Sequence, residues 1–264
     1  MKKLSKLSAI VSIASASLCA QSPTPARARG YMTSAQSASV LLIVPPAPAT
    51  GDPRFDADMA IFRSTRSLEG SPRWKLALSD DNLSVAGLLK AFSCALKLNL
   101  SPEIAPKLAA LIARAESDAG SAANVIKVHY QHKRPFQIAA GNVCLSPQGK
   151  AALERSPDYP SGHTSISWDI GLILAELAPA DASNVLTRAR EFGQSRVVCG
   201  VHNLSAVEAG WMTATAVFTM QSDSPEFRKD FEAAKGELAA LRTGGHATAS
   251  GCEAEAGALS KSPY

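Results

Sequence analysis

The sequence predicts an all-α protein, a single-domain helical bundle. Apolar residues recur at helical spacing through most of the chain, and no stretch alternates apolar and polar residues as a half-buried strand would. The size and composition agree, because 264 residues, 46% of them hydrophobic and 19% charged, suffice to bury one large core. No internal repeat or linker divides this core.

Each expected helix follows from an apolar stripe, and several ends carry their own signals. The helices are expected at Ala57–Leu68, Val85–Leu96, Glu103–Ala115, Ala122–Tyr130, Thr164–Leu177, Ala182–Gly193, Ala206–Met220 and Pro225–Leu241. A serine precedes proline at Ser101 and Ser224, which is typical of a helix start, and Asp181 can cap the helix that follows it. Gly244 and Gly245 end the last helix.

The two ends of the chain are expected to lie outside the bundle. Lysines followed by the short apolar stretch Leu7–Leu18 are typical of a secretory signal peptide, residues 1–20, and the pattern also allows the cleavage to fall as late as residue 28. A lipoprotein signal at Cys19 is disfavoured because the bulky Leu18 precedes it. We expect a mobile Pro/Ala/Ser-rich leader at 21–51, the globular domain at 52–244 and a loose tail at 245–264. The protein is then periplasmic or secreted.

Four cysteines remain after the signal peptide: Cys94, Cys144, Cys199 and Cys252. An even number in an exported chain indicates two disulfides. Of the three possible pairings we favour Cys94 with Cys144 and Cys199 with Cys252. Cys252 would then tie down the tail.

Charge and hydropathy exclude two classes of partner. The formal charge of +4 is modest and the basic residues form no long run, so nucleic acid is not expected as a partner. Asp169 and Glu176 interrupt the apolar run Thr164–Leu177, and Glu208 lies within Ala206–Met220, so stable membrane insertion is not expected.

Three short segments concentrate the groups that a phosphoryl-transfer site needs. They are Lys127 with Arg134-Pro135, then Pro160-Ser161-Gly162-His163, then Ser195-Arg196 with His202. Two arginines and a lysine supply positive charge for a phosphate dianion, the arginines as planar forks. The Pro-Ser-Gly turn before an apolar helix adds a hydroxyl and backbone N–H groups at a helix N-terminus, which attracts anions.

The two histidines, His163 and His202, are the candidates for chemistry. A neutral imidazole can attack phosphorus while a protonated imidazole opposite it gives a proton to the leaving alkoxide. No tight cluster of Asp and His is available to hold a metal, so we expect no metal and no other cofactor. Each segment alone is a common pattern, and the conjunction of all three carries the prediction.

These segments resemble the type 2 phosphatidic acid phosphatase superfamily, and within it the bacterial class A non-specific acid phosphatases. That signature is Lys-x6-Arg-Pro, Pro-Ser-Gly-His and Ser-Arg-x5-His-x3-Asp. The resemblance extends to the Pro-rich segment 42–48, to Thr65-Arg66 and to 70–74, and so covers roughly residues 41–240.

The resemblance implies an all-helical, periplasmic, metal-independent enzyme that hydrolyses phosphate monoesters at acidic pH. It implies that His202 is the nucleophile and His163 the general acid, with the phosphoryl group held by Lys127, Arg134, Ser161, Gly162 and Arg196. Small phosphomonoesters are the expected substrates, inorganic phosphate or vanadate the expected ligands, and a homo-oligomer the expected assembly.

One departure concerns the residue four positions after His202. The family has Asp there, which accepts a hydrogen bond from the far imidazole nitrogen, whereas this chain has Ala206. Glu208 points away from the same helix face, and a backbone carbonyl or water is another candidate partner. Asn203-Leu204 stands where the subgroup usually has Trp and a polar residue.

Ala206 keeps two alternatives open beside the phosphatase. One is an impaired family member that binds phosphate or phosphorylated ligands without turnover, for which Ala206→Asp should raise the rate sharply. The other, a vanadium haloperoxidase, uses the same anion cradle, but the class A-like sequence around the site favours the phosphatase.

Overall fold

The computed structural model describes residues 28–264, and the expected signal peptide at 1–20 lies outside this range. The described chain is helical and contains no β-strand, as the sequence predicts. The helices, with short 3-10 turns between some of them, are α1 (Ser34–Ser39), α2 (Pro53–Thr65), α3 (Pro72–Ser79), α4 (Val85–Leu96), α5 (Pro106–Tyr130), α6 (Pro135–Ile138), α7 (Pro147–Glu154), α8 (Gly162–Leu177), α9 (Ala182–Val198), α10 (Leu204–Gln221), α11 (Pro225–Thr243) and α12 (Cys252–Ala258).

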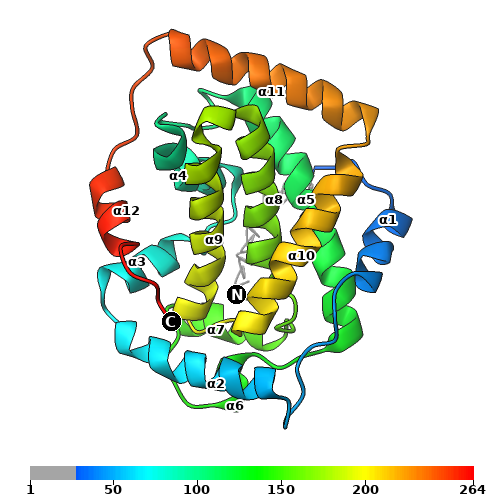
Figure 1. Ribbon diagram of the computed structural model, residues 1–264, viewed down its shortest axis with the longest axis vertical. Helices are drawn as coiled ribbons and strands as arrows, with labels where there is room; N and C mark the ends of the chain where they lie inside the picture. The colour runs from blue at the N-terminus through cyan, green and yellow to red at the C-terminus, as the bar shows by residue number, and fades with distance from the viewer. Residues whose placement is uncertain (1–27) are drawn as a thin grey trace, which may run out of the picture.

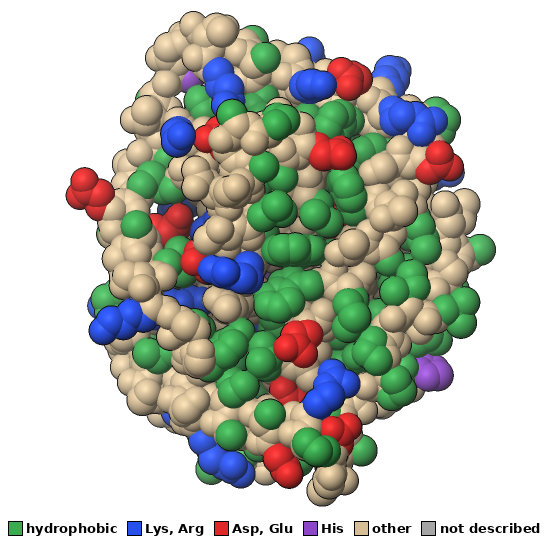
Figure 2. All heavy atoms as spheres, in the orientation of Figure 1, with side chains coloured by type: hydrophobic (Ala, Val, Ile, Leu, Met, Phe, Trp, Pro, Cys, Tyr) green, Lys and Arg blue, Asp and Glu red, His purple; other side chains and the backbone are tan. Residues whose placement is uncertain are grey.

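Helix α8 is the centre of the bundle. It packs against α5, α9 and α10, while α11 crosses one end of the molecule and α2 the other (Figure 1). On the face seen in Figure 2, hydrophobic side chains gather over the middle of the bundle. The larger of two clusters of buried hydrophobic residues in the described chain includes residues of α4, α5, α8, α9, α10 and α11, and the smaller one includes Trp74, Cys144 and Cys199.

Small residues let the central helices approach closely. A Cβ added at Gly171 of α8 would lie 2.5 Å from the Cβ of Ala189 on α9, and one at Gly210 of α10 would lie 2.7 Å from the Cβ of Thr164 on α8. Real Cβ atoms do not come this close, so glycine is required at both contacts. The second contact draws the N-terminal ends of α8 and α10 together, which is where the predicted site residues lie.

Two predicted helices, Glu103–Ala115 and Ala122–Tyr130, are one continuous helix, α5. The polar stretch between them suggested a break, but Asp118 in that stretch is buried and accepts hydrogen bonds from the backbone N–H groups of Tyr31 and Met32. A satisfied buried carboxylate lets the helix continue. Ser101 lies in the turn before α5, so its Ser-Pro pair does not begin the helix.

The N-terminal segment is more ordered than the sequence predicts for a mobile leader. Tyr31 donates a hydrogen bond to Asp230 (2.9 Å), and its ring packs edge-on against Phe227 of α11. Farther along, the backbone carbonyl of Pro45 accepts a hydrogen bond from the hydroxyl of Tyr159 (2.8 Å). Long-range contacts of this kind hold residues that composition alone assigns to a leader.

The disulfide pairing favoured from the sequence is wrong. Cys94 pairs with Cys252 and Cys144 pairs with Cys199, with Cα–Cα distances of 5.4 and 4.7 Å. The reason is topological, because the chain returns after α11 so that α12 lies beside α4 and α3 (Figure 1). Cys252 does tie down the tail, and the tail forms a helix there.

Candidate active site

The predicted site residues lie at helix ends around the N-terminus of α8. Lys127 is in the last turn of α5, Arg134 caps α6, Ser161 caps α8 with Gly162 and His163 in its first turn, Arg196 is in the last turn of α9, and His202 lies in the loop between α9 and α10. The backbone N–H of Ser161 donates to the carbonyl of Ala206 (2.8 Å), which fixes the start of α8 against the start of α10.

Direct contacts join these residues. Arg134 Nη1 lies 3.0 Å from His202 Nε2, and a Cβ built on Gly162 would lie 3.9 Å from the side chain of Lys127. Asp81 contacts both Arg196 (2.7 Å) and His163 Nε2 (3.3 Å), which joins the segment of Arg196 to that of His163. Burial, and after it the charge of Arg196, lowers the pKa of both Arg134 and His163. The structure therefore brings the three sequence segments together.

The contacts of His202 define its tautomer. Its Nδ1 lies 2.8 Å from Asp158 Oδ1, a carboxylate oxygen that accepts, and its Nε2 faces Arg134, which only donates. Nδ1 therefore carries the proton and Nε2 carries the lone pair. Burial, followed by the charge of Arg134, lowers the pKa of His202 well below its ordinary value, so the ring is neutral at mildly acidic pH.

Asp158 contacts the predicted site, and the sequence reasoning missed it. It is fully buried and also accepts hydrogen bonds from the backbone and side chain of Asn203 and from His132 Nδ1 (3.3 Å). Burial acts to raise the pKa of Asp158, but the hydrogen bonds from His132 and His202 prevail and hold it below its ordinary value. The side chain is thus a buried carboxylate anion.

Ala206 is fully buried, and the side chain of Glu208 is exposed. The partner of the far imidazole nitrogen is therefore neither Glu208 nor a backbone carbonyl, the protein groups considered from the sequence. The available signal was an acidic residue two positions before Pro160, just outside the second of the three recognised segments.

Arg196 is a cation of the described site whose hydrogen-bond donors are only partly used. Its side chain has no exposed surface, and one terminal nitrogen donates to Asp81 Oδ1 (2.7 Å). The other two nitrogens, Nε and Nη1, are buried without a hydrogen-bond partner. Buried N–H groups are rarely left unpaired, so these two donors indicate a place for an anionic ligand.

Lys127 and His163 titrate in a useful range. Burial, followed by the charge of Arg134, lowers the pKa of Lys127 to about 7, and its ammonium group donates to the carbonyls of Pro157 and Asp158. Burial, followed by the charge of Arg196, lowers the pKa of His163 to about 4. A bound anion would raise both values, because it favours the charged forms.

The Ser161 hydroxyl has a local role as well as its place in the site. Its oxygen accepts from the backbone N–H and the hydroxyl of Thr164, which caps α8. Since it accepts in both contacts, the hydroxyl retains its own proton to donate. Ser195, beside Arg196, donates instead to the buried Asp80 (2.6 Å) and is part of a separate network.

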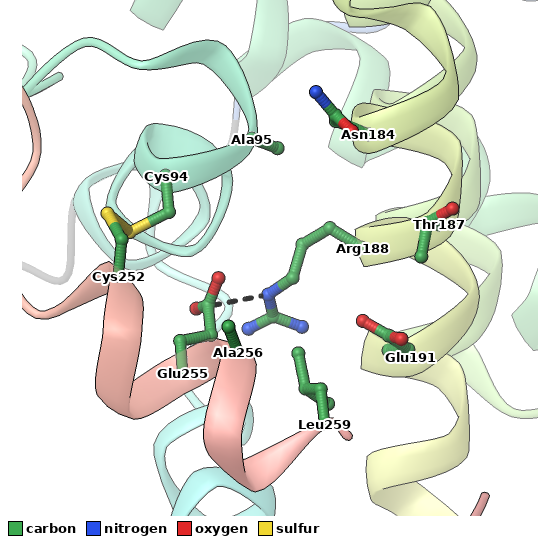
Figure 3. A pocket seen from close by; sticks show the side chains of 10 residues that line it. All are labelled: Cys94, Ala95, Asn184, Thr187, Arg188, Glu191, Cys252, Glu255, Ala256 and Leu259. Atoms are coloured by element: carbon green, nitrogen blue, oxygen red, sulfur yellow. Dashed lines mark hydrogen bonds and ion pairs between the residues drawn. A yellow bond between two sulfur atoms is a disulfide. The ribbon is translucent and has the colours of Figure 1, made fainter. Parts of the chain in front are cut away.

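A cavity of about 390 Å³ lies elsewhere, between α4, α9 and α12. Figure 3 shows the side chains that line it. Arg188 crosses it to Glu255, and the Cys94–Cys252 disulfide forms one wall.

Among residues 28–264 no group of three or more His, Cys, Asp and Glu side chains is placed to hold a metal ion. None of the helices formed by these residues has the length and apolar character needed to cross a membrane.

Comparison with known proteins identifies the family to which this chain is similar. The model of the PAP2 superfamily matches residues 108–227, which include all three segments. The chain is 41% identical over 210 residues to an acid phosphatase of Zymomonas mobilis, covering 78% of each protein. It is 33% identical to a non-specific acid phosphatase of Providencia stuartii (80% of this chain, 86% of that protein) and 31% identical to one of Salmonella typhi (77% and 81%).

Proposed function

The chain belongs to the PAP2 superfamily and is an acid phosphatase, and from this premise we propose that it hydrolyses phosphate monoesters through a phosphohistidine formed on His202. One observation supports this more than any other. It is a buried, neutral imidazole whose accepting nitrogen faces a cluster of incompletely neutralised cations. A nucleophile for phosphorus and a cradle for its oxygens then occupy the same place.

In this proposal the phosphoryl oxygens are held by five residues of the three segments. Arg196 donates from its two unpartnered nitrogens, and Arg134 from the group that now faces His202. Lys127 contributes a point charge, and the Ser161 hydroxyl and the backbone N–H of Gly162 donate at the N-terminus of α8, where the helix dipole also favours an anion. These contacts strengthen as charge develops in the transition state.

The reaction then proceeds in two displacements. The Nε2 lone pair of His202 forms a bond to phosphorus while the bond from phosphorus to the ester oxygen breaks, and His163 gives its proton to the leaving alkoxide. Water next attacks phosphorus and gives a proton to the neutral His163. The P–N bond breaks, inorganic phosphate leaves and His202 is again neutral.

The shifted pKa values favour acidic conditions. With its pKa lowered to about 7, Lys127 is charged below that pH and loses its charge above it. Burial, followed by the charge of Arg196, favours neutral His163, and the charge of the incoming phosphate favours the imidazolium that the leaving group needs. Both effects weaken catalysis as the pH rises past neutrality.

The contacts of the described site do not support the two alternative functions, the impaired phosphate-binding protein and the haloperoxidase. An impaired phosphate-binding protein was suggested because the nucleophile lacked an orienting carboxylate, but Asp158 contacts His202 Nδ1 directly. No contact of the described site specifically favours a haloperoxidase. We further propose that the enzyme is exported to the periplasm or medium, acts on small phosphomonoesters and assembles as a homo-oligomer, as the family resemblance implies.

The purified protein is expected to release phosphate from p-nitrophenyl phosphate at about pH 5.5 with EDTA present, and several-fold more slowly at about pH 8. Phosphate release is followed colorimetrically, and orthovanadate should inhibit it as a mimic of the five-coordinate state. Absence of phosphate release, or activity that EDTA abolishes, would contradict the proposal.

A further inference from the structure

We propose that Asp158 is the positioning residue of the nucleophile, supplying from the segment before α8 the carboxylate that Ala206 lacks on α10. This inference rests on the proposed function of His202. Ala206 is fully buried, and its side chain has no polar atom that could accept a hydrogen bond from the imidazole of His202. Asp158, in the segment before α8, accepts a hydrogen bond from Nδ1 of His202, and its Oδ1 lies 2.8 Å from that nitrogen.

The surroundings of Asp158 suit this role. A buried carboxylate needs several donors, and Asp158 receives them from His202, His132 and Asn203. His132 donates from its other nitrogen to the carbonyl of Pro48 (3.0 Å), so both of its nitrogens face acceptors and it is an imidazolium. The charge of His132 therefore balances Asp158 while His202 stays neutral.

The two departures from the family signature, Asn203 and Ala206, then have one explanation in the contacts of Asp158. Asn203 donates to Asp158 from its side chain (2.8 Å) and its backbone (3.3 Å), and it directly follows His202 in the chain. An aspartate at position 206 would place a second buried carboxylate near this region of the site, where like charges are costly. We therefore expect Ala206→Asp in the wild-type background to lower the rate and stability, contrary to the expectation from sequence alone.

The main test is Asp158→Asn, with Asp223→Asn, at the exposed Asp223 in the turn between α10 and α11, as the matched control. An asparagine can donate to Nδ1 of His202 and so favour the tautomer that puts a proton on the attacking nitrogen. We expect kcat/KM for p-nitrophenyl phosphate to fall about a hundredfold, with binding of inorganic phosphate by calorimetry changed less than about threefold. The control should match wild type.

Relocating the carboxylate sharpens this test. The double variant Asp158→Asn with Ala206→Asp should recover at least about tenfold over Asp158→Asn alone. Wild-type activity in Asp158→Asn, or a rate sharply raised by Ala206→Asp alone, would overturn the inference. If the variants fail to fold, ¹⁵N NMR of the wild-type histidines decides, because His202 must show a protonated Nδ1 and an unprotonated Nε2. The opposite tautomer would overturn the role of Asp158 even if the enzyme proves inactive.

A different set of contacts supports a second proposal, also resting on the proposed function. We infer that Asp81, in the turn between α3 and α4, positions the general acid and determines how well poor leaving groups are expelled. Its carboxylate contacts both Arg196 (2.7 Å) and His163 Nε2 (3.3 Å), and its backbone carbonyl lies 3.1 Å from the same nitrogen. His163 Nε2 thus faces two acceptors and carries a proton.

The proton for the leaving group is then the one on Nδ1 of His163, which is present only in the imidazolium. A carboxylate at Nε2 favours that charged form against burial and the charge of Arg196, which act to remove it. The turn is well anchored, because the neighbouring Asp80 is buried and bonded to Arg188 and Ser195. Figure 3 shows Arg188 held in turn by Glu255 of α12.

The test compares two leaving groups, because an alkoxide needs a proton far more than p-nitrophenolate does. Asp81→Asn should lower kcat for glycerol phosphate about tenfold and kcat for p-nitrophenyl phosphate less than about twofold. Asp81→Glu should regain part of the loss, and Asp223→Asn should show neither effect. A purely structural defect would lower kcat equally for both substrates. Equal losses of kcat would therefore overturn the proposed role of Asp81.

If the Asp81 variants do not fold, a structure of the wild-type protein tests the role of Asp81 instead. In a crystal structure with vanadate bound, the Asp81 carboxylate should remain within hydrogen-bonding distance of both His163 and Arg196. A carboxylate turned out to solvent would overturn the inference. A wild-type enzyme that hydrolyses neither ester contradicts the proposed function instead.

Discussion

Replacing His202 with alanine is expected to abolish phosphate release almost completely, lowering kcat/KM for p-nitrophenyl phosphate by at least about 10⁵-fold. No other imidazole is placed to form the covalent intermediate, because His163 faces Asp81 and His132 is held by Asp158 and Pro48. The cations remain, so inorganic phosphate should still bind. The measurements are steady-state kinetics and calorimetry on the same preparation.

The exposed His129→Ala on α5 is the matched control for this variant and should retain wild-type kinetics. Residual activity of His202→Ala above about one hundredth of wild type would contradict a covalent role. In a rapid quench of the wild type with a labelled substrate, label should appear on His202. Direct transfer to water without a labelled enzyme would also contradict the mechanism.

Replacing Arg196 with methionine is expected to lower kcat/KM by about 10⁴-fold, since an arginine that stabilises a transferring phosphoryl group contributes on that order. Two of its buried nitrogens have no hydrogen-bond partner within the protein, and burying such donors lowers the stability of the fold. We therefore expect the melting temperature of Arg196→Met to equal or exceed that of wild type. Loss of activity with stability retained is typical of a binding residue.

The control for Arg196 is Arg190→Met on the same helix, whose side chain is about half exposed and pairs only weakly with Glu191 (3.5 Å). It should leave both kinetics and melting temperature unchanged. Kinetics and differential scanning calorimetry check the pair of variants. A large drop in melting temperature for Arg196→Met with phosphate affinity intact would contradict the role of Arg196 as an anion ligand.

The sequence predicts the long helices well because their apolar stripes are long. Val85–Leu96 agrees at both ends with α4, and α9, α10 and α11 each begin or end within a few residues of the expectation. The short helices were missed because eight or fewer residues, with few or no buried side chains, give little periodicity. Ser71 and Ser146 each precede proline and cap α3 and α7, so the same signal that indicated α11 was present there.

The site residues also fall into those that the sequence predicts and those that it misses. Lys127, Arg134, Arg196 and the two histidines were chosen from spacing within short segments, and the structure brings these segments together. Asp158 and Asp81 act across segments that are far apart in the sequence, 44 residues in one case and 82 in the other. Such pairings depend on how α8, α9 and the α3–α4 turn pack, as does the pairing of the cysteines.

The central claim is that the two imidazoles lie on opposite sides of one anion, with the cations around it. A crystal structure with orthovanadate bound tests this most directly. We expect vanadium within bonding distance of His202 Nε2, with Lys127, Arg134 and Arg196 on its equatorial oxygens and His163 on the opposite side. Vanadate bound away from His202, or His163 and His202 on the same side of it, would contradict the account.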